Sequence, residues 1–477
     1  MKEVAEVGGR YLGSGWTPVG KTFAVHNPAT GAVVAEVADC GPSEALEAAA
    51  VAEREFAKWR HTTAFERSAI LDRWAALIVE HRDELAAVMS AEMGKPIKES
   101  RGEVVYAAGF VKWYAEEAKR VYGEAFPSHI GHKRLFALRQ PVGPVFGVTP
   151  WNFPVAMVTR KAAPALAAGC TFILKPAEQS PLCALLTADL WLEAGGPIGT
   201  LQVLPTADPA PLSDVLMTDE RVRKVTFTGS TEVGRILYRK SADTIKRLSL
   251  ELGGHAPLII CDDADLTIAV REAVACKYRN SGQTCVCTNR IYVQRGIAQA
   301  FTEAFSEASD RLKVGDPTSE DTDIGPLVDA QGLAKVNQHL QDALAKGAEI
   351  VSGGRAVDGL FFQPTVVTNV TPDMLMMQEE TFGPVAPIIE FDSLDEAVRL
   401  ANDTPYGLAA YVFTNDLSRA LKLAEALDYG IVGVNDGVPS TPQAPFGGVK
   451  QSGIGREGGR WGIEEYLEIK YVSMGLR

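Results

Sequence analysis

The fold is decided by the stretch VFGVTPWNFP, residues 145–154, where the pattern of the sequence changes. Val145–Val148 is a short apolar run of the kind that forms a buried strand. Two prolines then restrict the backbone around Asn152, and a helical segment begins near Pro154. A strand, a polar turn and a helix in this order are the first unit of a chain that alternates between strands and helices.

The same alternation continues along the chain in two blocks. The first block has strand-like runs at Thr171–Leu174, Leu201–Leu204, Val225–Phe227 and Leu248–Leu252, and the second extends from Pro257–Ile260 to Ile431–Val434. Alternating strands and helices favour a mostly parallel sheet that helices cover on both faces. The sequence therefore predicts an α/β protein whose ligands bind at the carboxyl ends of the strands.

The segments outside these blocks have other patterns. The first 40 residues carry short apolar runs between Gly and Pro, which predict an arm of strands and turns. Residues from Pro42 to about Val121 have helical spacing, with Ser43 as the expected N-cap. Tyr466–Val472 alternates apolar and polar residues, which predicts an edge strand with Leu135–Leu138 as its expected partner. Terminal strands of this kind can pair across subunits.

Length, charge and cysteine content limit the class of protein. A chain of 477 residues is too long for one core, so two or three domains are expected. The net charge is −13 and no block of Lys and Arg is dense enough to follow phosphates, which argues against nucleic acid as a partner. The seven cysteines include no Cys-x-x-Cys pair, which argues against a disulfide framework or a zinc site.

No segment predicts export or membrane insertion. The first residues are charged and no apolar run follows them, while the longest apolar run, Ala162–Leu174, is too short to span a bilayer. Together with the scattered cysteines, this predicts a cytoplasmic protein without a membrane or a metal as partner.

Cys285 is the candidate nucleophile. It follows a polar turn with a glycine, Asn280–Thr284, and precedes the apolar run Ile291–Val293. A loop held by a strand can present a thiol to a substrate, although a single cysteine is more often a small packing residue. Partners elsewhere in the chain are needed to decide between the two.

Two residues beside predicted strands suit acid–base and electrostatic roles. Glu251 stands near Gly253 and Gly254, so its carboxylate can approach a reacting centre, and a solvated Glu in a turn is the alternative. Asn152 lies in the proline-bounded turn, where it can donate to an oxyanion or else cap the helix that follows.

Two other strand ends carry residues that suit a nucleotide. Lys175 and Glu178 can hold the hydroxyls of a ribose, or form a surface ion pair. Phe227–Gly234 places glycines and Ser230 at the start of a helix, where backbone N–H groups can bind a phosphate. Each of these motifs is a weak signal by itself, but those of Asn152, Lys175, Phe227–Gly234 and Glu251 all lie at strand ends within the first block.

Together these motifs resemble those of the aldehyde dehydrogenase superfamily. The resemblance runs in order from Pro150–Pro154 to Tyr471, and it also includes Glu379–Val385 and Pro445–Gly448. It implies a Rossmann-type cofactor domain, an α/β catalytic domain and a small oligomerisation β-sheet, assembled as a homodimer or homotetramer. The implied limits are 1–121 and 144–252 for the dinucleotide-binding domain, 253–447 for the catalytic domain, and 122–143 with 460–477 for the oligomerisation strands.

The resemblance also implies roles for single residues. Cys285 is the nucleophile, Glu251 is the general base, and Asn152 forms an oxyanion hole with the N–H of Cys285. The residues implied to bind the dinucleotide are Thr149, Pro150, Trp151, Lys175, Ala177, Glu178, Gly229, Ser230, Leu252, Glu380 and Phe382.

These roles form a consistent reaction. The thiolate of Cys285 attacks an aldehyde, Asn152 stabilises the oxyanion, and a thioester remains after hydride transfer to NAD(P). Water activated by Glu251 then hydrolyses the thioester. Because CoA-acylating relatives generally lack this carboxylate, the expected product is a free acid.

Finer motifs are similar to those of the succinate-semialdehyde dehydrogenase branch. Arg160, Arg279 and Ser440 stand where that branch holds the far carboxylate of its substrate, and a guanidinium binds a carboxylate through two hydrogen bonds. A helix-surface cation for Arg160 and a helix-end cation for Arg279 are the alternatives. Pro439 and Pro442 depart from the branch, so glutarate semialdehyde, 2-oxoglutarate semialdehyde and phosphonoacetaldehyde stay open beside succinate semialdehyde.

Three further residues lead to separate predictions. Glu178 favours NAD over NADP because a carboxylate beside the ribose would repel a 2′-phosphate, although NADP stays open since the ribose can shift. Cys287 is a redox candidate, since a disulfide with Cys285 would block the nucleophile; simple packing is the alternative, because a bridge spanning one residue needs a mobile loop. His255 is expected to pack or to form a local hydrogen bond.

Two other classes compete with a redox enzyme. A catalytically silent structural or binding homologue would be expected to lose Cys285, Glu251 or Asn152, and all three are present. An esterase or acyltransferase would have no use for the dinucleotide residues, such as Lys175 and Glu380, which are retained.

Overall fold

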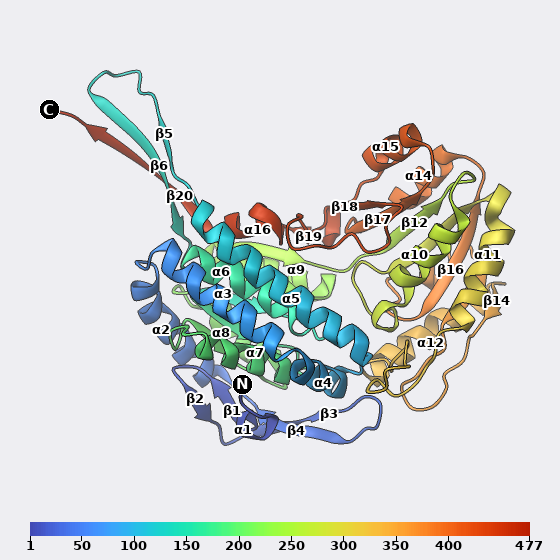
Figure 1. Ribbon diagram of the computed structural model, residues 1–477, viewed down its shortest axis with the longest axis horizontal. Helices are drawn as coiled ribbons and strands as arrows, with labels where there is room; N and C mark the ends of the chain where they lie inside the picture. The colour runs from blue at the N-terminus through green and yellow to red at the C-terminus, as the bar shows by residue number, and fades with distance from the viewer.

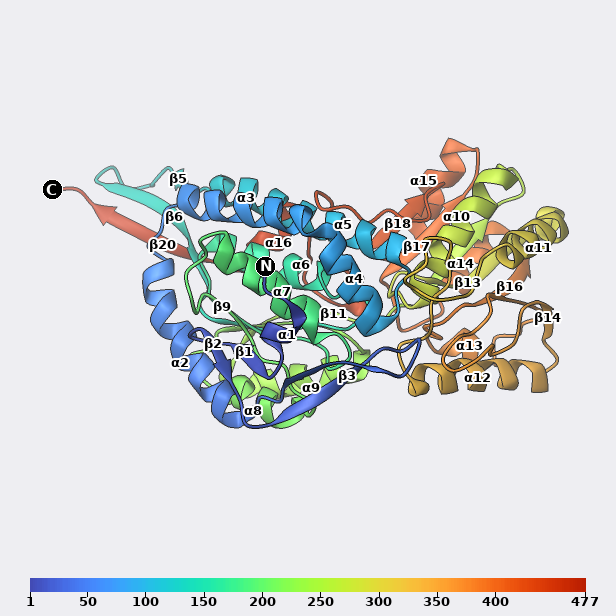
Figure 2. The ribbon, with the colours of Figure 1, turned by 60° about the horizontal axis from the view of Figure 1, so that its bottom comes forward.

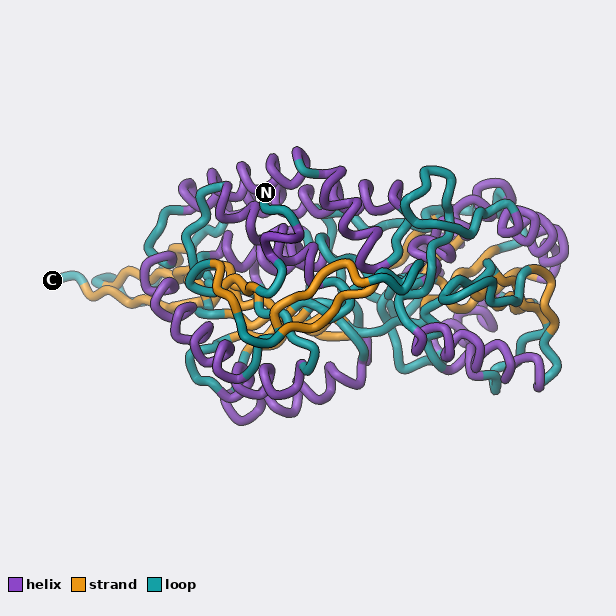
Figure 3. Tube along the Cα trace, turned by 90° about the horizontal axis from the view of Figure 1, so that it is seen from below, coloured by secondary structure: helices purple, strands orange, loops and turns teal.

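The computed structural model describes residues 1–477 and distributes the strands over separate sheets. Figure 1 shows one lobe around an eight-stranded sheet, a second lobe around a seven-stranded sheet, and an arm that projects from the first lobe. The two lobes stay side by side and the arm stays apart in the turned view of Figure 2. In Figure 3 helices lie on both sides of the strands of the first lobe. The predicted α/β class is confirmed.

The first lobe is built on a sheet with the strand order β19-β11-β10-β7-β8-β9-β1-β2. Strands β7 to β11 are parallel to one another, and the order reverses between β7 and β10, which is where sheets of this topology bind ligands. The strands are β1 (Arg10–Leu12), β2 (Trp16–Pro18), β7 (Val145–Val148), β8 (Phe172–Lys175), β9 (Leu201–Val203), β10 (Lys224–Thr228), β11 (Arg247–Glu251) and β19 (Gly453–Ile454).

The helices of this lobe include one, α6, that is buried along its whole length. Its two cations, Arg160 and Lys161, therefore need partners inside the protein, because an unpaired buried charge is costly. The helices are α1 (Val4–Val7), α2 (Pro42–Trp59), α3 (Ala64–Glu80), α4 (Arg82–Met93), α5 (Ile97–Glu117), α6 (Ala156–Ala168), α7 (Pro181–Glu193), α8 (Pro209–Thr218) and α9 (Thr231–Ser241).

The start of α2 differs from the prediction by two residues. Its N-cap is Gly41 rather than Ser43, and the N–H of Gly41 donates to the Glu44 carboxylate at 2.7 Å. Pro42 explains the difference, because a residue with a fixed φ and no N–H suits the first helical position.

The second lobe is built on a sheet with the strand order β14-β15-β16-β13-β12-β17-β18. All neighbours are parallel except β14, which pairs antiparallel with β15 at the edge. The strands are β12 (Ala256–Ile260), β13 (Thr288–Gln294), β14 (Glu349–Ser352), β15 (Thr365–Thr368), β16 (Val385–Phe391), β17 (Ala409–Phe413) and β18 (Ile431–Val434). The helices are α10 (Leu266–Tyr278), α11 (Arg295–Asp310), α12 (Ala330–Ala345), α13 (Leu375–Gln378), α14 (Leu394–Asn402) and α15 (Leu417–Ala426).

The arm is a three-stranded antiparallel sheet of β5 (Glu124–Phe126), β6 (Lys133–Pro141) and β20 (Leu467–Gly475). The expected pairing of the two segments is confirmed, since Tyr471 lies opposite Ala137. A short helix, α16 (Gly459–Glu464), precedes β20, and the hairpin of β3 (Thr22–His26) and β4 (Val33–Ala38) forms a separate sheet. The domain limits stay a prediction. None of the helices has the length and apolar character needed to cross a membrane.

Candidate active site

The carboxyl ends of four neighbouring strands bring predicted residues to one edge of the first sheet. Thr149 follows β7, Lys175 ends β8, Gly229 follows β10 and Glu251 ends β11. Since these strands adjoin in the order β11-β10-β7-β8, the four residues form one row. Ser230 lies at the same edge and caps α9, where its hydroxyl accepts from the N–H of Val233 at 3.3 Å. A helix N-terminus beside a glycine is a suitable place for a phosphate.

Lys175 and Glu178 are in contact beside this row. The Lys175 ammonium donates to the Glu178 carboxylate at 3.0 Å. The Lys175 side chain is only 5% exposed, whereas that of Glu178 is 40% exposed, so the pair is more than a surface contact. Its carboxylate side faces solvent at the end of β8, where a ribose can reach it.

Residues of the second lobe complete this region. Trp151 and Phe382 meet edge to face with their ring centroids 5.6 Å apart. The Glu380 carboxylate accepts from the N–H of Gly254 at 3.3 Å, and burial raises the pKa of Glu380 to about 7. A Cβ on Gly253 would lie 2.9 Å from the Glu380 carboxylate, so the glycine leaves room for it. Polar strand ends, a helix N-terminus and a carboxylate between the lobes fit a bound dinucleotide.

A cavity of about 290 Å³ contains the candidate nucleophile. Cys285 lines it together with all three predicted substrate residues, Arg160, Arg279 and Ser440. Further lining comes from α5 and from apolar side chains: Tyr106, Phe153, Met157, Val286, Val438 and Phe446.

The loop before Cys285 makes a sharp turn. Asn280, Ser281 and Gly282 all have positive φ, at 51°, 57° and 76°. A Cβ on Gly282 would lie 2.3 Å from the carbonyl oxygen of Gly383, so glycine is required there. Burial raises the pKa of the Cys285 thiol, and the nearby Arg160 offsets part of this rise, so that the pKa is about 12. Because the thiolate is the reactive form, the thiol has to lose its proton before it attacks a substrate.

Asn152 contacts this loop through its side chain. Its amide Nδ2 donates to the carbonyl oxygen of Gln283 at 3.1 Å, two residues before Cys285. The helix that follows begins at Ala156 with Val155 as N-cap, so the alternative of a helix cap is wrong. The Asn152 amide oxygen is buried and has no hydrogen-bond partner.

Glu251 is buried with both carboxylate oxygens unpartnered. Burial raises the pKa of Glu251 well above its usual range, and the Glu457 carboxylate adds to the rise. The alternative of a solvated turn residue is wrong, because the residue is only 3% exposed. Buried polar groups without partners are rare, and a ligand or water commonly completes them.

Arg160 is held on one side and free on the other. Its Nε donates to Glu457 at 2.7 Å and its guanidinium lies 4.0 Å from the Phe446 ring centroid, while Nη2 has no partner. The alternative of a helix-surface cation is wrong, because Arg160 is 3% exposed. Glu457 also pairs with Lys161, so the two cations of α6 share one carboxylate.

Sequence reasoning did not single out Glu457. It lies 297 residues from Arg160, within a glycine-rich stretch that carries no local signal for a buried ion pair.

The remaining candidates lie in different surroundings. Arg279 directly follows α10, and its guanidinium lies 5.4 Å from the Phe153 ring centroid without forming an ion pair. Cys287 is buried away from the cavity lining, with its sulfur 3.3 Å from the Lys277 ammonium. His255 is buried and its Nε2 donates to the carbonyl oxygen of Met376 at 3.1 Å, which confirms the expected local role.

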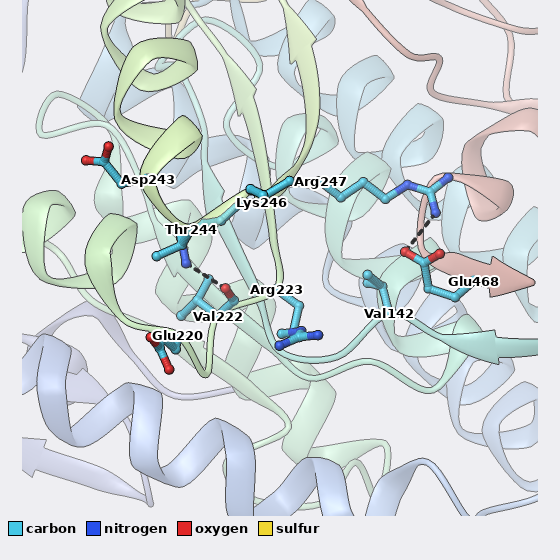
Figure 4. Close-up of a pocket in the computed structure, with 10 residues that line it drawn as sticks. Val142, Glu220, Val222, Arg223, Asp243, Thr244, Lys246, Arg247 and Glu468 are labelled. Carbon is cyan, nitrogen blue, oxygen red and sulfur yellow. Dashed lines mark hydrogen bonds and ion pairs between the residues drawn. The ribbon is translucent and has the colours of Figure 1, made fainter.

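A larger cavity, of about 740 Å³, lies at the base of the arm (Figure 4). None of the predicted site residues lines it. Its lysine, Lys246, donates to the carbonyl oxygens of Asp219 and Val222 at 2.7 Å each, and Arg247 pairs with Glu468 at 3.3 Å. Lys246 and Arg247 therefore already have partners within the chain.

Residues 16–472 match the model of the aldehyde dehydrogenase family, and the chain belongs to this family. It is therefore an NAD(P)-dependent oxidoreductase with the family's fold, which confirms the resemblance found in the sequence. Its relatives include the mitochondrial succinate-semialdehyde dehydrogenase of Arabidopsis thaliana, which is 52% identical over 98% of this chain and 88% of that protein. The glutarate-semialdehyde dehydrogenase of Pseudomonas putida is 49% identical over 98% of this chain and 97% of that protein.

A solved structure has the same fold and a comparable sequence identity. The crystal structure of an aldehyde dehydrogenase from Brucella melitensis biovar abortus 2308 matches with a TM-score of 0.98 at 49% identity. The match covers 100% of this chain and 99% of that one.

Proposed function

We propose that this protein oxidises aldehydes that carry a carboxylate at the far end, with succinate semialdehyde as the best substrate and succinate as the product. The observation that carries the proposal is the unpaired Nη2 of Arg160 beside the cavity that contains Cys285. A buried donor without a partner is costly, and a guanidinium recognises a carboxylate with charge-assisted hydrogen bonds. Arg279, which has no ion pair, and Ser440 supply further donors on the same lining.

In this proposal Cys285 and Asn152 carry out the first step. The Cys285 thiol first gives up its proton to solvent; its sulfur then bonds to the aldehyde carbon, and the carbonyl electron pair moves onto the oxygen to give a thiohemiacetal oxyanion. The Asn152 amide donates to that oxygen, which is stabilising because the site is buried. Arg160 and Arg279 hold the far carboxylate and so orient the aldehyde.

When bound, the dinucleotide supplies the acceptor for the hydride that leaves the substrate carbon. A thioester on Cys285 results. Glu251 then removes a proton from a water molecule, whose oxygen attacks the thioester. The bond between carbon and sulfur breaks, the acid is released, and the proton returns from Glu251 to the Cys285 sulfur. The raised pKa of Glu251 makes it a stronger base than an exposed Glu, which suits this role.

We propose that the eleven residues implied by the family resemblance bind the dinucleotide, and that NAD is the preferred dinucleotide. Glu178 supports this preference because its half-exposed carboxylate would repel a 2′-phosphate. Measured kcat/KM should be higher with NAD than with NADP, and Glu178→Ala should reduce the ratio by about 10-fold. A higher value with NADP for the unaltered protein would refute the preference.

The substrate is tested with a set of aldehydes. The kcat/KM for succinate semialdehyde should exceed that for butanal, which has the same four carbons without the carboxylate. Arg279→Gln should lower kcat/KM by about 10- to 100-fold for succinate semialdehyde and leave butanal nearly unchanged. Equal losses for both aldehydes would refute the carboxylate site.

Glutarate semialdehyde is the second candidate substrate, since a relative at 49% identity carries that name. It is one methylene longer, so it needs the same cations at a greater distance from the thiol. The same set of aldehydes decides between the two by the ratio of kcat/KM values.

Cys287 stays a proposed redox partner of Cys285. Because its sulfur lies against Lys277, a disulfide requires the loop to rearrange first. After inactivation by peroxide, a smaller share of the lost activity should return on adding a thiol in Cys287→Ala than in the unaltered protein. Equal reversibility in both would show that no such disulfide protects Cys285.

A further inference from the structure

Tyr106 is paired with the predicted substrate residue Ser440. Their hydroxyl oxygens lie 2.5 Å apart, although the residues are 334 positions apart in the sequence. Tyr106 belongs to α5, while Ser440 belongs to a loop without regular structure. Both residues line the cavity that contains Cys285 and Arg160.

The direction of this hydrogen bond follows from the two hydroxyl groups. A separation of 2.5 Å leaves room for one hydrogen between the oxygens. The geometry fits either hydroxyl as the donor. Because a phenol is the more acidic group, we assign the shared hydrogen to Tyr106 and the acceptor role to Ser440. The hydrogen of Ser440 has no other partner in the chain and is free to point into the cavity.

The surroundings hold both groups in place. The Tyr106 ring packs edge to face against Phe110, with centroids 5.0 Å apart. Ser440 stands between Pro439 and Pro442, which restrict the loop backbone. A hydroxyl that accepts a hydrogen bond also becomes a better donor, because linked hydrogen bonds polarise one another.

We propose that Tyr106 is a positioning residue that sets substrate specificity by orienting the hydroxyl of Ser440 toward the far carboxylate. Tyr106 donates to Ser440, and Ser440 donates to the carboxylate. This pair of linked hydrogen bonds rests on the proposed function, because it has a purpose only if the substrate carries an anion at its far end. A neutral aldehyde gains nothing from it.

The test uses Tyr106→Phe, which keeps the ring and removes only the hydroxyl. Its KM for succinate semialdehyde should rise by about 3- to 10-fold, while its kcat and its kcat/KM for butanal stay nearly unchanged. Tyr122→Phe is the matched control, since Tyr122 is 70% exposed and does not line the cavity. This control should behave as the unaltered protein with both aldehydes.

The double variant separates positioning from direct contact. Once Ser440→Ala has removed the hydroxyl that donates to the carboxylate, adding Tyr106→Phe should cause no further rise in KM. A further rise would show that Tyr106 contacts the substrate itself and would overturn the proposal, as would an equal loss with butanal. An unaltered protein without preference for succinate semialdehyde over butanal would overturn the proposed function and this inference together. A clear preference that Tyr106→Phe leaves intact would overturn only the role of Tyr106.

Discussion

At the scale of single residues, unpartnered polar atoms gather around Cys285. Arg160, Asn152, Glu251 and Thr284 each have at least one buried nitrogen or oxygen without a hydrogen bond. Folding around such atoms is unfavourable unless a ligand completes them. Arg160 and Thr284 line the cavity that contains Cys285, and Asn152 contacts the loop before it, so these atoms support the proposed chemistry.

Glu251→Gln should separate the two halves of the reaction. The amide keeps the shape of the side chain but cannot accept a proton, so the thioester should form and then persist. A first burst of NADH is expected, followed by steady turnover reduced by about 10²- to 10⁴-fold. Rapid-mixing absorbance measures the burst, and mass spectrometry of quenched protein detects the acylated Cys285. Loss of the burst itself would place Glu251 before hydride transfer.

Glu380 predicts a pH dependence of cofactor binding. Its pKa is raised to about 7 by burial, so the free protein holds this carboxyl largely protonated below that pH. A protonated carboxyl is a poorer acceptor for ribose hydroxyls, and the KM for NAD should rise as the pH falls through about 7. Steady-state kinetics between pH 6 and 9 would measure the change. Glu380→Gln should have a high KM that no longer varies over this range, and a retained pH dependence would assign it to another group.

At the scale of elements, one face of α5 connects the loops of Asn152 and Cys285. Glu99 and Glu103, four residues apart, lie on one face of α5, and Lys95 lies in the segment just before this helix, which begins at Ile97. Lys95 donates to the carbonyl oxygen of Asn152 at 2.7 Å. Glu99 accepts from the N–H of Asn280 at 2.8 Å. Glu103 pairs with Lys95 and accepts from two N–H groups at the start of α6.

This face should fix the separation between the oxyanion donor and the thiol. Glu99→Gln weakens the contact with the Cys285 loop without leaving a cavity, and kcat should fall by about 10-fold while the KM for NAD stays unchanged. Glu116→Gln at the exposed end of the same helix is the matched control and should have no effect. Thermal unfolding would check that both variants fold. An unchanged kcat in Glu99→Gln would remove α5 from the positioning of the site.

Local sequence signals were sufficient for some of these elements but not for others. The strands β7 and β18 have the predicted limits, because each is a short apolar run bounded by Pro or Gly before it and by a polar residue after it. β14 has no such pattern, since three of its four residues are exposed at a sheet edge. The prediction of Ser43 as N-cap failed because the preceding proline competes for the helix start.

The candidate site divides in the same way. Cys285, Glu251 and Arg160 were found because each stands in a motif or beside a strand end. Glu457 and Tyr106 were missed because their partners lie 297 and 334 residues away, and no local pattern records such a contact. Contacts of this kind become visible only when the fold brings the segments together.

At the scale of the whole molecule, the arm exposes an apolar surface. Phe126, Ile469 and Tyr471 are 41%, 62% and 59% exposed, and the Phe126 and Tyr471 rings stack with centroids 6.2 Å apart. Pairing across the sheet places them on one face. Apolar side chains gathered on a projecting sheet mark an interaction surface, and a second copy of the chain is the proposed partner.

Ile469→Asp should therefore reduce the size of the assembly. A charge in an apolar interface is unfavourable, so light scattering after size-exclusion chromatography should show a smaller mass than for the unaltered protein. Leu417→Asp, at a residue of α15 that is 75% exposed, is the control and should leave the mass unchanged. An unchanged mass for Ile469→Asp would assign the interface to another surface.

The ion pair between Arg160 and Glu457 has a consequence for synthesis on the ribosome. Arg160 is translated 297 residues before its partner, and β6 is likewise made long before β20. Until residues 453–475 emerge, a nascent chain holds α6 with two uncompensated cations and an arm that lacks its longest pairing. Domains often fold as they leave the ribosome, but here the first lobe has to wait for a late segment. We therefore expect the emerging chain to expose unfinished surfaces for longer than a protein with mainly local contacts does.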